Sequence, residues 1–328
     1  MKKRILLIVM ILALALSLAS CAGTAAKLDT EKEISVMVLN GTTGFGAAKL
    51  IDDSKNGNAA LNYKFSVESD ASAVNAALIN GSVDIAALPT NAAAVVFNKT
   101  QGGVKVAAVN TLGVLYVVEK GNTVKSFADL KGKTLYVPGQ GSNPEYITQY
   151  LCEKNGLEVG KDITLDFTYN APADLRTAVA SGQVELAVLP EPMVTIAKSA
   201  NSELNTALNL TEEWNKVAKK DSLMQGCIVV TKKFAEENPK ELNKFLEEYG
   251  ASVAYVNENP KEASEMIAAH GIFEKAAIAE KAIPNCNLCY ISGDTMKTSL
   301  GEFFKVMFDA NAKSIGGALP SDDIYYIG

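Results

Sequence analysis

Residues suited to binding a small molecule follow the apolar run at residues 34–40, which we expect to form the first strand. Glycine lets the backbone approach a ligand closely, threonine offers a hydroxyl, and the start of a helix offers N–H groups with partial positive charge. The segment lacks the Gly-Lys-Ser/Thr ending of a phosphate-binding loop, and a plain glycine-rich turn is the alternative interpretation. The candidate binding residues here are Asn40, Gly41, Thr42, Thr43, Gly44 and Phe45.

A second glycine-rich segment, residues 138–146, follows the apolar run at 134–137. Ser142 and Glu145 have the spacing of a capping box, and Pro144 suits the first turn of a helix. Pure helix capping is the alternative, although a capped helix start is also a good polar binding site. Because a glycine-rich segment leading into a helix follows each of two strands, we expect two helix starts to face one cleft. The candidates in this segment are Gly141, Ser142 and Asn143.

An internal repeat supplies a third group. Residues 75–89 match residues 176–190 without gaps, and the match aligns Gly81 with Gly182 and Pro89 with Pro190. This predicts two lobes built on one plan, in which each glycine ends a helix and each proline closes a strand. Ligands of doubly wound sheets bind beyond the carboxyl ends of strands. The candidates at such ends are Thr90, Asn91, Asn170, Glu191 and Gln225.

Charges and aromatic rings near these segments bear on the class of ligand. Arg176, the only arginine after Arg4, falls mid-helix in the repeat. We expect it on the surface, which leaves no guanidinium to clamp an anion in bidentate fashion. Glu191 could accept from an amine or amide, or it could be a solvated loop carboxylate. Phe45, Tyr116 and Tyr146 could stack on a flat ring, with core packing as the alternative.

These features favour a small neutral or weakly charged ligand, such as a heteroaromatic vitamin precursor. A small anion of the alkanesulfonate or nitrate type, held by helix starts, is the runner-up. We expect no cofactor.

Apolar runs and helical patterns alternate along the chain, which indicates an α/β protein with parallel sheets covered by helices. The pattern restarts near residue 134, and the apolar run at 227–231 returns the chain to the first half. We therefore expect two Rossmann-like lobes, the first made of residues 33–118 and 226–328 and the second of residues 119–225. Two crossings, near 116–123 and 222–230, predict a hinge.

The N-terminus is expected to be processed. Lys2, Lys3 and Arg4 precede an apolar run that is too short for a membrane span, which is typical of a signal peptide over residues 1–20. The sequence Leu-Ala-Ser-Cys at 18–21 resembles a bacterial lipobox, and this implies lipidation of Cys21. The small and polar residues that follow predict a tether over 21–32.

Composition excludes several classes of function. Loss of residues 1–20 removes three positive charges, so the net charge changes from −6 to −9, which argues against nucleic acid as a partner. Zinc is disfavoured because Cys286 and Cys289 form the only close cysteine pair and His270 is the only histidine. We interpret that pair as buried or occasionally bridged thiols. One distant histidine also cannot complete a nucleophilic or acid–base set, so we do not expect an enzyme.

Several motifs together resemble a known family. They are the lipobox, the first glycine-rich segment, Leu-Lys-Gly-Lys-Thr at 130–134, the two Gly-x-Val-[Asp/Glu] strands of the repeat, and the tail segments 283–288 and 314–320. In these features the chain is similar to substrate-binding proteins of ABC importers of the nitrate/sulfonate/taurine and thiamine-precursor type. The resemblance implies a type II periplasmic-binding-protein fold that closes on its ligand. It also implies an ABC permease and its ATPase as partners of a monomeric, membrane-anchored protein.

Two alternatives remain open from the sequence. The same cleft would serve a ligand sensor for a membrane receptor. Some proteins of this fold synthesise a pyrimidine precursor, but they carry a cluster of histidines and cysteines that this chain lacks.

Overall fold

The computed structural model describes residues 28–328. The expected signal peptide (1–20), the lipidation site Cys21 and most of the expected tether lie outside the described residues. Residues 31–328 form one compact unit, which contains two β-sheets. None of the helices in the described part of the chain combines the length and the apolar character needed to cross a membrane.

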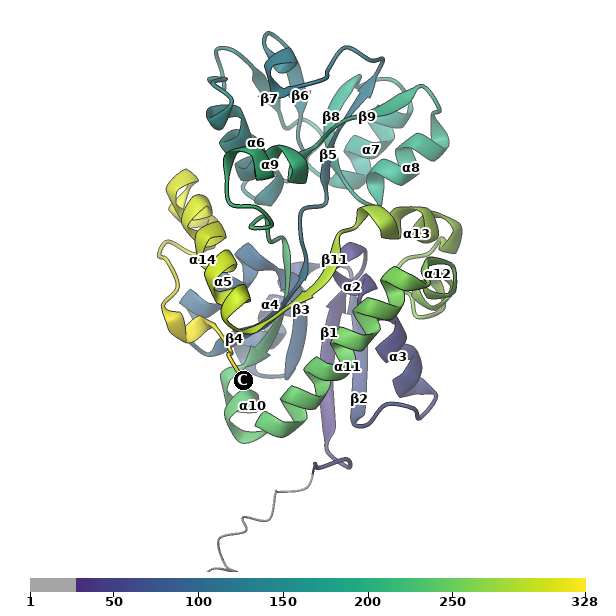
Figure 1. The fold of residues 1–328 in the computed structure, drawn as a ribbon, viewed down its shortest axis with the longest axis vertical. Helices are drawn as coiled ribbons and strands as arrows, with labels where there is room; N and C mark the ends of the chain where they lie inside the picture. Colours follow the sequence, from purple (N-terminus) through teal and green to yellow (C-terminus); the bar gives the residue numbers. More distant parts are fainter. Residues whose placement is uncertain (1–27) are drawn as a thin grey trace, which may run out of the picture. The chain divides into compact units, whose positions relative to one another are not determined.

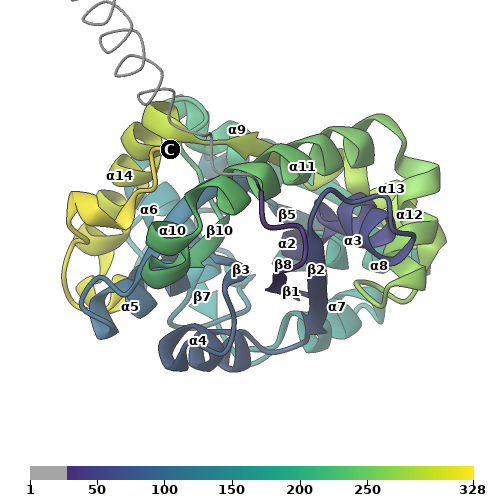
Figure 2. The same ribbon diagram turned by 90° about the horizontal axis from the view of Figure 1, so that it is seen from below.

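The first sheet has six strands in the order β11-β4-β10-β3-β1-β2 (Figure 1). Its middle strands β3, β4 and β10 are buried at almost every position, as expected for strands covered on both faces. Figure 2 shows α11 and α4 on opposite faces of this sheet. The strands are β1 (Glu33–Leu39), β2 (Asn62–Glu68), β3 (Ile85–Pro89), β4 (Val104–Thr111), β10 (Gly226–Thr231) and β11 (Leu288–Ile291). The helices on this side are α2 (Thr42–Phe45), α3 (Ala48–Lys55), α4 (Ala71–Asn80), α5 (Thr90–Lys99), α10 (Lys232–Glu237), α11 (Pro239–Glu258), α12 (Pro260–Ala269), α13 (Ala276–Ala282) and α14 (Gly293–Ala310).

The second sheet has five strands in the order β7-β6-β8-β5-β9. They are β5 (Leu115–Lys120), β6 (Thr134–Tyr136), β7 (Thr164–Asp166), β8 (Leu186–Pro190) and β9 (Leu204–Asn209). The helices on this side are α6 (Asn143–Lys154), α7 (Pro172–Ala180), α8 (Met193–Ala200) and α9 (Leu210–Val217).

Both sheets are mixed rather than purely parallel, so that expectation is wrong in detail. β10 runs antiparallel to β3 and β4, and β5 runs antiparallel to β8 and β9. The edge strand β11 is also antiparallel to β4. The chain enters β10 and β5 from the other sheet, without a crossover helix that packs on the sheet the strand joins. Parallel neighbours need such a crossover helix, whereas antiparallel neighbours do not.

The first crossing lies earlier in the chain than the sequence suggested. β5 pairs with β8 and β9, so residues 115–118 belong to the second sheet and not to the first lobe. The crossing is therefore the short segment 112–114 rather than residues 116–123. A Cβ on Gly113 would lie 2.1 Å from Thr211 Oγ1, so glycine lets α9 pack directly against the crossing. The chain has returned to the six-stranded sheet at Gly226, where β10 begins.

The two copies of the repeat form the same helix–strand unit, α4–β3 in one sheet and α7–β8 in the other. Gly81 ends α4 with a left-handed φ of 72°, and Gly182 follows the end of α7 with a φ of 79°. Pro89 and Pro190 are the last residues of their strands. The role expected of each glycine and each proline is therefore confirmed.

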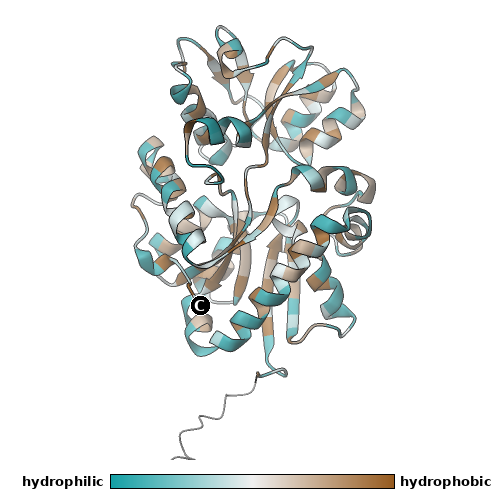
Figure 3. Cartoon of the chain, in the orientation of Figure 1, coloured by the Kyte–Doolittle hydropathy of each residue, from teal (hydrophilic) through white to brown (hydrophobic). Residues whose placement is uncertain are grey.

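The apolar core extends from one sheet to the other. Figure 3 shows the strands mostly in the hydrophobic colours and the outer faces of the helices in the hydrophilic ones. Trp214, to which the sequence assigned no role, is 1% exposed. Its ring lies 4.7 Å from that of Tyr150 on α6 and 5.9 Å from that of Phe303 on α14. Because α14 belongs to the first side and α6 and α9 to the second, this aromatic cluster joins the two sides.

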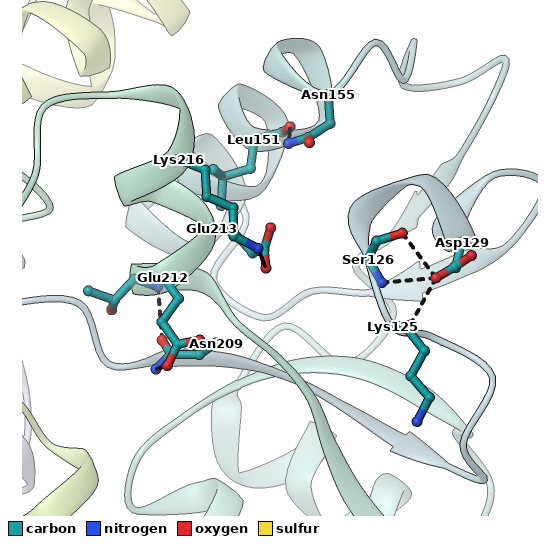
Figure 4. A network of polar contacts seen from close by, with 10 residues as sticks. Lys125, Ser126, Asp129, Leu151, Asn155, Asn209, Glu212, Glu213 and Lys216 are labelled. Atoms are coloured by element: carbon teal, nitrogen blue, oxygen red, sulfur yellow. Dashed lines mark hydrogen bonds and ion pairs between the residues drawn. The ribbon is translucent and has the colours of Figure 1, made fainter.

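Local hydrogen bonds fix the helix ends on the five-stranded side (Figure 4). Ser126 and Asp129 form a reciprocal capping box at the short helix Phe127–Leu130. Asn209 caps α9 by accepting from the N–H of Thr211, and its amide donates to Glu212. Such contacts satisfy N–H groups that a helix start leaves without intrahelical partners.

Candidate functional site

The glycine-rich segment after β1 forms a tight turn into the short helix α2. Gly41 has a φ of 81°, and its N–H donates to the carbonyl of Ile272 at 2.9 Å. A Cβ on Gly44 would lie 2.2 Å from the carbonyl oxygen of Leu39, which is backbone and cannot move aside. Gly44 is therefore required by close packing. The neighbouring candidate Asn40 is exposed.

A buried amide that the sequence analysis missed holds this turn in place. Asn110, at the end of β4, is 1% exposed, and its Nδ2 lies 3.1 Å from the carbonyl oxygen of Thr43 and 2.9 Å from the hydroxyl of Tyr249. Its Oδ1 accepts from Thr111. A polar side chain at the end of an otherwise apolar strand is the sequence signal that could have identified it.

Two of the predicted segments meet between the sheets. The hydroxyl of Thr42, which follows β1, donates to the backbone carbonyl of Glu191, which follows β8, at 2.8 Å. Thr42 is 8% exposed and Glu191 is 4% exposed, so this contact is buried. The ends of a strand from each sheet therefore lie against one another.

Glu191 is buried, and its carboxylate is hydrogen-bonded within the start of α8. Its oxygens accept from the N–H of Thr195 at 3.1 Å and from the Thr195 hydroxyl at 3.0 Å, within the first turn of α8. Burial raises the pKa of the Glu191 carboxyl above its ordinary value, and the hydrogen bonds from Thr195 act in the opposite direction. The carboxylate is therefore not a solvated loop group, and its role as an acceptor for a ligand stays a prediction, since each oxygen can accept a further hydrogen bond and Glu191 lines a pocket.

Thr90 and Gln225 tie the crossing segments to the first sheet. Thr90 is fully buried, its N–H donates to the carbonyl of Gln225 at 3.1 Å, and its hydroxyl donates to Met224 at 2.7 Å. The Gln225 side chain accepts from the N–H of Val114 at 2.7 Å. These polar atoms are engaged within the protein. Asn91 differs, because it is half-buried and its side chain forms no hydrogen bond within residues 28–328.

The start of α6 has no side-chain cap. Ser142 occupies the N-cap position without a side-chain cap, since its hydroxyl donates to Gly139, and Glu145 accepts from Gly141. The expected capping box is therefore not formed. Asn170 secures the loop by accepting from the N–H groups at positions 139 and 140. Asn143 is 6% exposed, and its buried Oδ1 has no partner within the described residues.

The three aromatic candidates are core residues. Phe45 is fully buried and packs edge to face on Phe273, with ring centroids 6.1 Å apart. Tyr146 is 6% exposed and accepts from Asn311, while the hydroxyl of Tyr116 donates to the carbonyl of Asn285. Core packing, the alternative interpretation, is therefore the one this structure supports.

One pocket of about 470 Å³ includes two of the residues named from the sequence, Glu191 and Tyr116, and is lined by residues from both sides of the protein. It lies between α8 and the segment from α13 to residue 285, with Glu191 in its lining and Lys198 and Lys281 among the others. A larger groove of about 620 Å³ runs between α6 and α14, but it is lined by surface side chains and includes none of the predicted residues.

Metal ligation and thiol chemistry find no support in the part of the chain that the structure describes. No group of three or more His, Cys, Asp or Glu side chains is placed to hold a metal ion there. Cys286 and Cys289 are free thiols. Burial raises the pKa of Cys289 to about 12, so its reactive thiolate form is disfavoured.

Known structures share this fold. An ABC transporter protein from Parabacteroides distasonis is 27% identical, with a TM-score of 0.75 and coverage of 91% of this chain and 99% of its own. The periplasmic aliphatic sulphonate binding protein SsuA from Escherichia coli is 15% identical, with a TM-score of 0.68 and coverage of 89% and 90%. The periplasmic nitrate-binding protein NrtA from Synechocystis PCC 6803 is 15% identical, with a TM-score of 0.53 and coverage of 72% and 65%. The expected type II periplasmic-binding-protein fold is therefore confirmed.

No curated protein matches the sequence. A family model does match, over residues 59–279, and it describes the periplasmic substrate-binding protein of ABC transporters for phosphonate. The match spans more than half of the chain. The chain therefore belongs to this family of ABC-transporter substrate-binding proteins, which are not enzymes but bind a small ligand and deliver it to a permease and its ATPase.

Proposed function

We propose that this protein is a lipid-anchored, extracytoplasmic receptor that captures a small oxyanion between its two sheets for an ABC importer. The observation that carries the proposal is the buried hydrogen bond from Thr42 to Glu191. It joins the carboxyl ends of β1 and β8, and in doubly wound sheets such ends are where ligands bind. A molecule enclosed there would contact both sides at once.

The starts of α5 and α6 are the polar groups best placed to hold the ligand. Neither helix has a side-chain cap. The N–H of Thr90 donates to Gln225 and Pro144 has no N–H, so the N–H groups proposed for a ligand acceptor are those of Asn91 in α5 and of Asn143 and Glu145 in α6. Asn91 at the start of α5 and Asn143 at the start of α6 carry side-chain groups without partners in residues 28–328. A ligand held between the two starts would satisfy donors from both sides of the protein.

The structure weakens the two observations that favoured a neutral ring compound. The aromatic candidates are buried, and the Glu191 carboxylate is occupied by Thr195. Helix starts favour negative charge, which leaves the small oxyanion as the better supported class. The matching family is described for phosphonate, and two similar structures are named for sulphonate and nitrate binding.

Segments 112–114 and 218–225 are the proposed hinge, since both connect the two sheets. We assign each residue to the lobe whose sheet its element belongs to, so β5 lies in the second lobe. Closure about this hinge would bring the loops after β1 and β8 into the contact seen here.

Ligand binding is tested with the mature protein and a panel of methylphosphonate, ethanesulfonate, nitrate and neutral pyrimidines. An oxyanion should raise the melting temperature, because it binds only the folded state. Asn143→Ala should weaken its binding by about 2- to 10-fold, the effect of one hydrogen bond, whereas Asn58→Ala on an exposed loop should not. Stabilisation by a pyrimidine alone would reverse the assignment of ligand class.

The anchor and the partner are tested in cells. Cys21→Ser should release the protein from the membrane fraction and abolish incorporation of labelled fatty acid. Wild-type protein should copurify with permease subunits after cross-linking. Copurification with a membrane receptor instead would favour the sensor alternative.

A further inference from the structure

The proposed function assigns no role to the tail segment 283–288, one of the motifs named from the sequence. It begins with the short helix Ile283–Asn285 and continues through Cys286 and Asn287 into β11. In Figure 1 the chain passes from α13 to β11 at the border between the two sides of the protein. Its residues 285–287 contact both the candidate site and the first crossing between the sheets, as follows from the hydrogen bonds of Asn285 and Asn287.

Asn285 meets the second side at the pocket of about 470 Å³. The hydroxyl of Tyr116 donates to the backbone carbonyl of Asn285 at 2.7 Å. The Asn285 side chain acts on the Glu191 carboxyl, where it partly offsets the rise in pKa that burial causes. In the lining of this pocket the first side is represented by Asn285 and Lys281, and the other lining residues belong to the second side. A solute in the pocket would therefore meet the first side at this segment.

Asn287 holds the first crossing between the sheets. Its side-chain amide donates to the carbonyl of Gly113 at 2.5 Å, and its backbone carbonyl accepts from the N–H of Leu112 at 3.0 Å. Its backbone is left-handed, with a φ of 45°, a conformation that asparagine tolerates better than most residues. One residue of the first side thus fixes the crossing at two successive positions.

The crossing is in turn bonded to the second crossing and to the candidate site. The N–H of Val114 donates to the Gln225 side chain at 2.7 Å, and the carbonyl of Val114 accepts from the N–H of Glu191 at 3.0 Å. A Cβ on Gly113 would lie 2.6 Å from Leu223, so the two crossings are in close contact. A rotation about the crossing must therefore rearrange bonds that reach the pocket.

The segment is also held within its own side, independently of these contacts. Asn257 on α11 donates to the carbonyl of Leu288, directly after the segment, at 3.0 Å. Cys286 is fully buried and lies beside Thr42 of the first side. The bonds of Asn285 to the second side and of Asn287 to the crossing are additional to those that hold the segment in place.

We propose that segment 285–287 couples the pocket at Glu191 to the hinge, and that Asn287 is a positioning residue for solute capture. The inference rests on the proposed function and deepens it. A solute that draws the second side onto Asn285 stabilises the arrangement in which Asn287 holds the crossing. Loss of either contact shifts the empty protein toward separated sides, which lowers the apparent affinity for a solute enclosed between them.

The first test measures the separation of the two sides in the mature protein without ligand. Spin labels on Asn58→Cys in the first side and Lys161→Cys in the second report their distance by pulsed electron paramagnetic resonance. Both positions are exposed, whereas the cysteines of the described part of the chain are buried or half-buried.

Two variants in this labelled background remove one hydrogen bond each. Asn287→Gly tolerates the left-handed φ and loses the amide, and Tyr116→Phe loses the hydroxyl that donates to Asn285. Each should raise the ratio of long to short distances by about 3- to 10-fold. Asn257→Ala, the matched control, removes a bond to the same stretch of chain within the first side and should match wild type. Distances in Asn287→Gly and Tyr116→Phe that match those of wild type would refute the proposal.

The double variant of Tyr116→Phe and Asn287→Gly tests the coupling itself. If the segment couples the two contacts, loss of one already weakens the other, so the double variant should change the ratio by less than the product of the single effects. A ratio equal to that product would show two independent contacts and would overturn the coupling.

Titration with methylphosphonate, ethanesulfonate, nitrate and a neutral pyrimidine separates this inference from the proposed function. If wild type binds one of these probes, Asn287→Gly should bind it about 3- to 10-fold more weakly, although Asn287 does not line the pocket. Equal affinity would refute the role of Asn287 in capture and leave the receptor function standing. If wild type binds none of them, the proposed oxyanion receptor is wrong, and the distance measurements alone decide the coupling.

Discussion

The contact between Thr42 and Glu191 gives the sharpest test of how the two sides meet. Thr42→Val keeps the shape of the side chain and removes only the hydroxyl that donates to the Glu191 carbonyl at 2.8 Å. Thr42 is the only residue in the described part of the chain that donates to this oxygen. With the donor gone, a buried carbonyl is left without a partner.

The expected cost follows from burial. A buried acceptor that loses its donor costs about 1–3 kcal/mol, and replacing a hydroxyl by a methyl group at an 8% exposed site returns part of this. We therefore expect Thr42→Val to lower the free energy of unfolding by about 1–2 kcal/mol. For a protein of this size, that corresponds to a fall in Tm of about 2–6 °C.

Thr43→Val is the matched control, since it makes the same chemical change at the neighbouring position. The Thr43 hydroxyl forms no hydrogen bond within residues 28–328, and its backbone carbonyl, which accepts from Asn110, is retained. Urea unfolding followed by circular dichroism, with ligand absent, measures both variants. Equal stability of the two, within about 0.5 kcal/mol, would show that the contact between the sheets does not form in solution.

Two further predictions concern the same site. Burial raises the pKa of the Glu191 carboxyl in the folded protein, so the contribution of this group to stability is greatest below its unfolded pKa and is lost as pH rises through the folded pKa. The stability of Glu191→Gln relative to wild type should accordingly improve from pH 4 to pH 8 in chemical unfolding, and a difference that does not vary with pH would contradict the shift. Gly44→Ala should destabilise the protein by at least about 3 kcal/mol, because its Cβ would lie 2.2 Å from the Leu39 carbonyl oxygen. Gly81→Ala, whose Cβ meets no atom within 4 Å, should cost only its left-handed backbone conformation (φ 72°), about 1–2 kcal/mol, and equal losses in the two variants would refute the packing argument.

The repeated plan and most of the strands and helices could be predicted from the amino-acid sequence. Local signals were sufficient for this, because apolar runs, left-handed glycines such as Gly81 and strand-ending prolines such as Pro89 act over a few residues. The family also followed from such short motifs, and the matching model confirms it.

The sequence could not determine which polar groups remain available to a ligand. Thr90, Glu191 and Gln225 looked like free ligand groups. The Thr90 hydroxyl and the Gln225 side-chain oxygen are instead bonded to residues far away in the chain, and the Glu191 carboxylate accepts from Thr195 in the first turn of α8. Arg176 was expected on the surface and is half-buried, and its Nε has no hydrogen-bond partner within residues 28–328. Hydrogen-bond donors and acceptors are assigned by three-dimensional neighbours, so only the tertiary structure decides which are satisfied.

The boundary between the two sides also could not be located from the sequence. The apolar run across residues 104–118 identified two strands but not the sheet to which β5 belongs, since both sheets offer a place for a buried strand. That choice rests on pairing with β8 and β9, which lie about 70 and 90 residues further along the chain. Strand pairing depends on contacts remote in sequence, and no local pattern encodes it.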